Sequence, residues 1–193
     1  MPLACKIYEL VGVRTEDAIR ALELNESVAT IARTSYSGFI FTFKLPDGSP
    51  VRIEICVFRG RTFLIVLAGR RRAEKAAKLI ANAVGAGVTD AEVDPLRFMN
   101  LFKGSVVKVA VFDMVRKLGL RRVVLAGDAV SDTDLYKEFA ESYKIRYVLF
   151  QTGEGSVLGI SDSGSLVVLS RITEEDILRT VKETLLPLIV PLS

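Results

Sequence analysis

Short apolar runs with strand character dominate the first half of the chain. Three of them follow one another closely and are rich in β-branched and aromatic residues: GFIFTFKL (38–45), VRIEICVF (51–58) and TFLIVLAG (62–69). Such residues favour strands, and the connections PDGSP and RGR carry turn residues, so the pattern predicts an antiparallel three-strand meander. A strand at 5–12 and a helix at 15–23 are expected before it.

The meander is followed by a segment with helical spacing, 71–84. One face of this segment is apolar and consists of Ala73, Ala76, Ala77, Ile80 and Val84. The basic residues fall largely elsewhere. This is the pattern of a helix that packs by one face against a sheet.

The second half of the chain starts again after GAGVTDAEVDP. We expect helices at 95–102 and 105–118, a strand at 121–128, a helix at 131–142 capped by Ser131, strands at 144–152, 156–164 and 165–170, and a helix at 173–189. A hairpin is expected at Asp162–Gly164. Thr173 followed by three acids is typical of a helix start.

Both halves therefore read strand, helix, three-strand meander, helix. The pattern predicts an α+β protein with two similar β-α-β-β-β-α units, whose antiparallel sheet is backed by helices. The expected boundaries are 1–87 for the first unit, 88–119 for linking helices and 120–193 for the second unit.

This order resembles the TATA-binding-protein fold, a tandem of two units that form a saddle-shaped sheet. The resemblance covers FIFTFKLPDGSPVRIEICVF, RGRTFLIVLAG and the basic helix, from Phe39 to Gly85. In that family a pair of phenylalanines wedges between base steps of DNA. Phe39 and Phe58 occupy those two places in the first half, whereas the position corresponding to Phe58 in the second half falls near Ser161.

The alternation of side chains between the two faces of each strand is compatible with this fold, but it predicts that the DNA-kinking pair is absent. Val51 and its alternate neighbours form the core-facing set, which leaves Arg52, Glu54, Cys56 and Phe58 on an open face. Phe39 shares its parity with Phe41 and Phe43, a set that looks like core. We therefore expect Phe39 under the sheet, away from Phe58.

The second half also resembles a different group of proteins. IRYVLFQTGEGSVLGISDSGSLVVLS is similar to the three-strand meander of the roadblock and longin families. Those families act as dimerising partners of small GTPases. The resemblance implies a protein-interaction or dimerisation module that uses a sheet edge or the apolar 105–118 segment.

Composition excludes several kinds of chemistry. The chain of 193 residues has no histidine, which removes Ser-His and Cys-His pairs, the HExxH zinc site and the usual general base. Its two cysteines form no spaced motif, so no metal site or disulfide framework is expected. No membrane span or secretory signal is evident. We expect a cytoplasmic protein, and the scarcity of Asn and Gln suggests a thermophilic source.

Basic residues are concentrated in the first half. The net charge is +3, from 13 Lys/Arg against 9 Asp/Glu in residues 1–90 and 13 against 14 thereafter. The candidate nucleic-acid contacts are Arg59, Arg61, Arg70, Arg71, Arg72, Lys75, Lys78 and Phe58. A seven-residue strand of about 20 Å separates the first two arginines from the next three, so they are expected to form two patches. The alternative is an ordinary solvated helix start.

An acidic motif resembles the metal-binding loop of haloacid-dehalogenase-like phosphatases. It is VVLAGDAVSDTD (123–134), preceded by VAVFDMV with Asp113. The spacing from Asp113 to Gly127 is too short for the sheet and helices of that fold. We interpret Asp128, Ser131 and Asp132 as loop and cap residues, and a magnesium-dependent phosphatase is the third-ranked hypothesis.

The hypothesis that follows is a non-catalytic binding or assembly module without a cofactor. Its expected partner is nucleic acid, bound through the Arg-rich elements of the first half. The alternative is a roadblock-like or longin-like module with a protein partner or a second copy of itself.

Overall fold

The computed structural model describes residues 3–35, 38–113 and 119–190, and divides into two compact units. The N-terminal unit consists of Leu3–Ala91 together with Ile172–Pro187. The C-terminal unit is built on Glu92–Arg171 and takes in the chain from Leu188. Eleven strands and five α-helices occur in the described residues, and the strand pairs are antiparallel, which confirms a mixed α and β fold. None of the described helices is long and apolar enough to cross a membrane.

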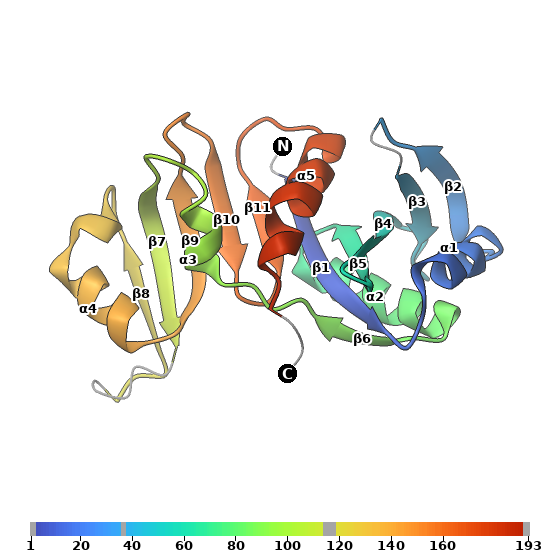
Figure 1. Cartoon of the computed structure of the whole chain (residues 1–193), viewed down its shortest axis with the longest axis horizontal. Helices are drawn as coiled ribbons and strands as arrows, with labels where there is room; N and C mark the ends of the chain where they lie inside the picture. Colours follow the sequence, from blue (N-terminus) through green and yellow to red (C-terminus); the bar gives the residue numbers. More distant parts are fainter. Residues whose placement is uncertain (1–2, 36–37, 114–118, 191–193) are drawn as a thin grey trace. The chain divides into compact units, whose positions relative to one another are not determined.

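The N-terminal unit has an antiparallel sheet with the strand order β2-β3-β4-β5-β1-β6 (Figure 1). Its strands are β1 (Leu3–Val11), β2 (Val28–Arg33), β3 (Phe39–Lys44), β4 (Pro50–Phe58), β5 (Arg61–Leu67) and β6 (Gly87–Asp90). The predicted meander is thus present as β3, β4 and β5. Arg59 and Gly60 join β4 to β5, and both have positive φ (50° and 74°), as a two-residue turn of type I′ requires.

Two helices pack on one face of this sheet. α1 (Thr15–Glu23) and α2 (Arg70–Val84) cover a buried cluster that includes Phe41, Phe43, Ile53 and Leu64. α2 approaches the sheet closely because Ala73, Ala76, Ala77 and Ala81 form its buried face with Ile80. The predicted helix and its apolar face are confirmed.

The opposite face of the same sheet is covered by the end of the chain. α5 (Glu174–Thr180) continues as a π-helical turn, Val181–Leu185, and a 3₁₀ turn, Leu186–Leu188. Its buried residues recur at helical spacing: Ile177, Leu178, Val181 and Leu185. Lys182 Nζ lies 2.6 Å from Glu54 Oε1 on β4, and Ser35 donates a hydrogen bond to Glu175.

The prediction of an open sheet face was therefore wrong. Glu54 and Cys56 are buried, and burial raises the pKa of the Cys56 thiol to about 12. The expected boundaries also differ, because the 173–189 helix was assigned to the second unit and packs with the first. The physical reason is that an apolar stripe shows which side of a helix is buried, but it does not show which sheet the helix packs against.

The strands of the C-terminal unit are antiparallel and lie in the order β11-β10-β9-β7-β8. Its strands are β7 (Val106–Asp113), β8 (Arg122–Ala126), β9 (Ile145–Gln151), β10 (Val157–Ser161) and β11 (Ser165–Val168). The hairpin at Asp162–Gly164 is confirmed. The helix expected at 105–118 is wrong over Val106–Asp113, which is strand β7; residues 114–118 lie outside the described residues. A short apolar run fits the period of a helix as well as that of a strand, and the four valines of this run favour the strand.

Helices α3 (Pro95–Met99) and α4 (Asp134–Ser142) belong to this unit. α3 contributes Phe98 to an aromatic cluster with Phe102 and Phe150. The N-cap of α4 is Thr133, whose hydroxyl accepts from the Tyr136 amide, whereas the predicted cap Ser131 lies in the preceding 3₁₀ turn, Val130–Asp132.

The two units pair their strands differently. In the N-terminal unit the strand before the first helix, β1, lies beside β5, the last strand of the meander. In the C-terminal unit the corresponding strand, β8, pairs with β7 and not with β11. The shared order of elements does not extend to the same topology, so the matched tandem repeat is not confirmed.

Replacement of Gly159 by alanine is expected to destabilise the C-terminal unit by about 1 kcal/mol. A Cβ at this position would lie 2.1 Å from Tyr147 Oη and 3.2 Å from Leu149 Cδ1. The partly buried phenol must therefore leave its place over the glycine. Urea unfolding measures the change, with Gly127→Ala as the control, since its Cβ would meet only Val130 at 3.6 Å. Equal stabilities for the two variants would contradict the prediction.

Candidate nucleic-acid interface

Helix α2 carries five of the seven predicted basic residues, and three of them lie on the side that faces away from the sheet. Because its alanine face is buried, the residues about 180° around the helix are exposed. Arg71, Lys75 and Lys78 lie there, at i, i+4 and i+7. The rise of 1.5 Å per residue places Arg71 and Lys78 about 10 Å apart along the axis. We call these three residues the outer stripe.

The outer stripe is only weakly neutralised. Arg71 and Lys78 make no ion pair or hydrogen bond with the described residues. Lys75 Nζ lies 3.6 Å from Asp47 Oδ2, and both side chains are about half exposed, so this pair contributes little. The three side chains are therefore available to contact an anion.

The other two arginines of α2 flank the stripe on opposite sides. Arg70 Nε donates to Glu74 Oε1 at 2.8 Å, and this pair raises the pKa of Arg70 and lowers that of Glu74. Arg72 Nη2 donates to the carbonyl oxygen of Pro50 at 2.6 Å, which fixes the side chain but leaves its charge unopposed. Arg72 can thus add to the potential of the stripe.

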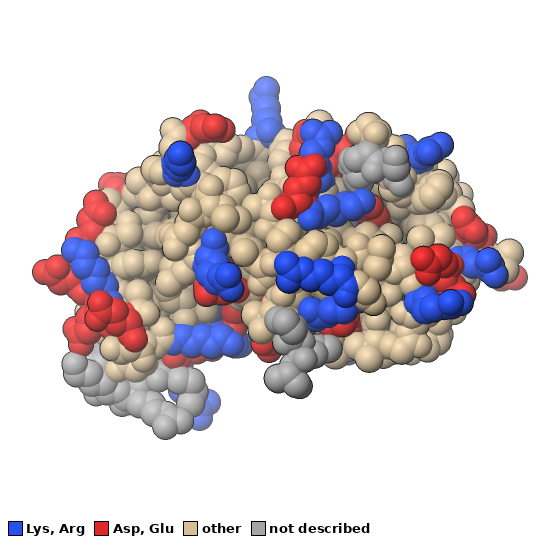
Figure 2. Space-filling model, viewed as in Figure 1, with Lys and Arg blue, Asp and Glu red and all other residues tan. Residues whose placement is uncertain are grey.

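The charge of α2 is unusual for its position. Five cations against Glu74 give the helix a charge of +4, and its first turn contains no acid. Cations at a helix N-terminus oppose the helix dipole, so the run is not explained by helix stability. On the face drawn in Figure 2, Lys and Arg alternate with Asp and Glu, so the basic helix is not part of a uniformly positive protein.

The structure does not bring the remaining candidates to this helix. Arg59, Arg61 and Phe58 lie at the β4–β5 turn, at the other end of β5 from α2, as the two-patch prediction expects. Arg61 is held by Glu9, with Nε 2.9 Å from Oε1, and its guanidinium lies 5.1 Å from the Phe63 ring. Arg59 stacks on Phe58 at 5.2 Å.

The phenylalanines of the TATA-binding-protein resemblance lie at strand ends. Phe39 is 40% exposed, so the prediction that it is buried beneath the sheet was wrong, whereas Phe41 and Phe43 are core. Phe58 is half-buried. Phe39 begins β3, where the sheet no longer covers its side chain.

Beside α2, strand β1 supplies two side chains, Lys6 and Tyr8, that are not among the predicted site residues. Lys6 is 1% exposed, and its Nζ lies 2.9 Å from Asp90 Oδ1 and 5.2 Å from the Tyr8 ring. Tyr8 is 4% exposed, and its buried hydroxyl has no hydrogen-bond partner among the described residues. A lysine in the apolar run CKIYELVG was the available signal, since lysine is rarely buried.

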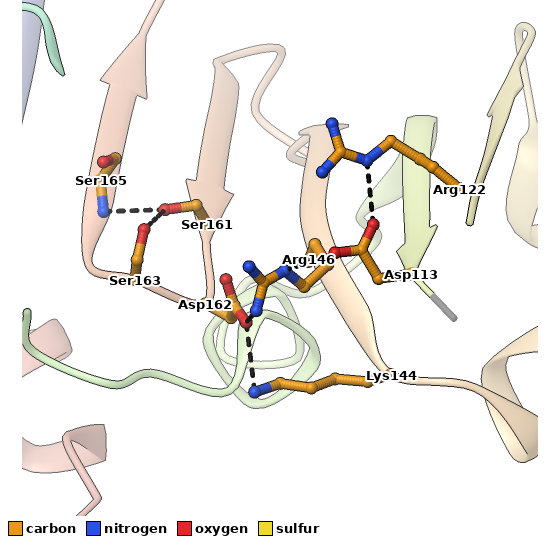
Figure 3. A network of polar contacts seen from close by, with 8 residues as sticks. All are labelled: Asp113, Arg122, Lys144, Arg146, Ser161, Asp162, Ser163 and Ser165. Atoms are coloured by element: carbon orange, nitrogen blue, oxygen red, sulfur yellow. Dashed lines mark hydrogen bonds and ion pairs between the residues drawn. The ribbon is translucent and has the colours of Figure 1, made fainter. Parts of the chain in front are cut away.

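A second polar cluster lies in the C-terminal unit (Figure 3). Arg146 bridges two carboxylates, with Nε 3.0 Å from Asp113 Oδ2 and Nη1 2.8 Å from Asp162 Oδ2. Arg122 hydrogen-bonds Asp113 and holds the pKa of that carboxyl below its usual range, and Lys144 lies 3.2 Å from Asp162. Each acid is paired with two cations, so the cluster links strands and offers no spare carboxylate.

The acidic residues of the phosphatase-like motif form no carboxylate cluster within the described residues. The described residues contain no group of three or more His, Cys, Asp or Glu side chains that could hold a metal ion. Asp128 and Asp132 are exposed, and the Asp128 carbonyl accepts from Lys108. A cavity of about 320 Å³ borders Lys144 and Asp162, but Asp94 on its wall caps α3.

A comparison with protein-family models gave no match, and no curated protein sequence matched the chain.

Proposed function

We propose that this protein is a non-catalytic binding module that associates with nucleic acid through the outer face of α2. The observation that carries the proposal is the outer stripe, Arg71, Lys75 and Lys78, which is exposed and weakly opposed by acids. Its length of about 10 Å corresponds to about three nucleotide steps at 3.4 Å per step along one strand.

Binding of this kind is directed at phosphates. Lysine and arginine on a solvated helix face neutralise phosphates and release counterions, without reading base sequence. The proposal does not depend on the TATA-binding-protein-like tandem, which stays a prediction. Arg61 has no part in it, because Glu9 already holds its guanidinium.

Fluorescence anisotropy with labelled duplex DNA and single-stranded RNA, measured over a salt series, tests the proposal. Three phosphate contacts on a single strand give a slope of about −2 in log K against log salt, so a fourfold rise in salt weakens binding about 20-fold. A protein that binds neither ligand at low salt would refute the function.

A second candidate function is self-assembly through a sheet edge. β8 is the last strand in the order of the C-terminal unit, and among the described residues it pairs only with β7. Val124 is 57% exposed, and the strand shows no register shift, whereas the edge strand β2 has one at Val28/Thr30. Such bulges protect edges from pairing, so β8 is the less protected edge.

Charge also permits the pairing of two β8 strands. An antiparallel pair centred on Val124 sets Arg122 of one copy opposite Ala126 of the second copy and the two Val124 side chains opposite each other. No like charges are then opposed. We therefore propose a second copy as the partner of β8.

Val124→Lys is expected to raise the Kd of this dimer by about tenfold or more, because lysine on an edge opposes strand pairing. Sedimentation at several concentrations measures the effect. Ile31→Lys on β2, where Ile31 is 45% exposed, is the control and should leave the mass unchanged. A wild-type protein that is monomeric at all concentrations would exclude the assembly role.

A further inference from the structure

A pocket lies between α2, β1 and β6, on the flank of α2 that carries Glu74. Its volume is about 300 Å³, at the small end of ligand sites. The lining residues are Tyr8, Glu74, Ala77, Lys78, Val88, Thr89 and Asp90. Lys78 belongs to the outer stripe, so the pocket opens beside the proposed phosphate contacts.

The pocket contains a hydrogen-bond donor that is not satisfied. Tyr8 is 4% exposed, and its hydroxyl has no partner among the described residues. A buried hydroxyl without a partner costs about 1–3 kcal/mol. Burial, followed by the charges of Asp90 and Glu74, raises the pKa of Tyr8, so the hydroxyl stays protonated and can donate. The site therefore calls for a ligand with an acceptor atom.

The carboxylates of the pocket argue against a phosphate as that ligand. Asp90 and Glu74 are both about half exposed on its wall. Each has a cation, Lys6 at 2.9 Å and Arg70 at 2.8 Å, and each carboxylate keeps further lone pairs as acceptors. A ligand must then offer donors as well as an acceptor.

The remaining wall is mostly apolar. Ala77, Val88 and Thr89 complete the lining with Tyr8, and this surface suits a flat heterocycle. Nucleobases combine such faces with donors and acceptors along one edge.

We propose that this pocket binds an unstacked nucleobase, with the Tyr8 hydroxyl donating to a base acceptor and Glu74 or Asp90 accepting from a base amine. For a base within a strand, the inference rests on the proposed function, because the outer stripe would hold the adjoining phosphates. The same chemistry can be met by a free nucleoside. If the pocket takes a base within a strand, the protein prefers single strands, because the bases of a duplex are stacked and paired.

Tyr8→Phe tests the pocket without removing its ring. Loss of an unsatisfied hydroxyl is expected to leave the thermal stability unchanged or raise it. Tyr136→Phe, at a buried tyrosine of the C-terminal unit, is the matched control.

The first arm titrates the four uncharged nucleosides to about 10 mM against both variants and the wild type, followed by NMR, since millimolar Kd values are then readily detected. We expect shifts at residues 8 and 88–90 with at least one nucleoside in the wild type and the control, and a loss of about tenfold or more in affinity in Tyr8→Phe.

The second arm compares a single-stranded oligonucleotide, its duplex and an abasic strand that keeps every phosphate. We expect the intact single strand to bind about tenfold more tightly than the abasic strand, because base contacts contribute about 1–3 kcal/mol each. Tyr8→Phe should reduce this difference and leave duplex binding unchanged. If the pocket binds free nucleosides only, we expect the NMR shifts with a nucleoside but no difference between the intact and the abasic strand.

Failure of the pocket is distinguishable from failure of the phosphate contacts. If no nucleoside shifts the spectrum and intact and abasic strands bind equally, the pocket proposal is overturned while salt-dependent binding stands. If nucleosides bind but no strand does, the pocket stands and the α2 function falls.

Discussion

Replacement of Arg71, Lys75 and Lys78 together by glutamate is expected to weaken nucleic-acid binding on the order of 100-fold at about 50 mM salt, and to reduce the salt slope by about two. The three side chains form the outer stripe of α2, and among the described residues their one ion pair is the half-exposed Lys75–Asp47 contact at 3.6 Å. Their reversal removes the proposed phosphate contacts and adds repulsion. Anisotropy over a salt series measures both quantities.

The variant should remain folded, because none of the three side chains is buried. Glutamate in the first turn also interacts favourably with the helix dipole, which offsets the change at position 71. Circular dichroism measures whether the variant keeps the secondary structure of the wild type.

Arg20, Lys103 and Lys137 provide a matched control, since their replacement by glutamate changes the net charge equally at exposed positions elsewhere. Equal losses in the two triple variants would show that net charge, and not the α2 face, determines binding.

Replacement of Lys182 by methionine is expected to destabilise the N-terminal unit by about 3 kcal/mol. Lys182 lies 2.6 Å from Glu54, which is 1% exposed, so the variant leaves a buried carboxylate without this cation. The apolar stem is conserved, and packing of the helix changes little. Urea unfolding at pH 7 measures the difference.

The double variant Glu54→Gln, Lys182→Met should recover part of this loss, because no charge is then buried. Arg179→Met is the control on the same helix. Arg179 is about half exposed and lies 4.0 Å from Asp176, so its replacement should cost less than about 0.5 kcal/mol. If Lys182→Met cost no more than Arg179→Met, the C-terminal helix would not cover the Glu54 face in solution.

The local elements of the N-terminal unit were largely predictable. Alternation and turn residues predicted β3, β4 and β5 within two residues at each end, and the alanine face predicted α2. Turns and amphipathic helices depend on residues that are close in the chain, so their patterns can be recognised in a single sequence. Strand β7 was missed because a short apolar run fits either period.

The candidate site was predictable only where it lies on one helix. The outer stripe follows from the spacing of Arg71, Lys75 and Lys78 alone. The pairing of Arg61 with Glu9, 52 positions away, and the burial of Tyr8 beside β6 depend on strand order, which a meander pattern leaves open.

The sequence by itself determined the mixed α and β composition, the hairpins, the basic helix and the absence of histidine chemistry. Tertiary structure alone decided that the last helix covers the sheet of the first half, that Glu9 holds Arg61, and that the Tyr8 hydroxyl has no hydrogen-bond partner among the described residues. The physical reason is that burial free energy depends on the area removed from water and not on position in the chain. An apolar stripe such as Ile177, Leu178 and Val181 predicts that this face of the helix is buried. Which sheet buries it is determined only in the folded chain.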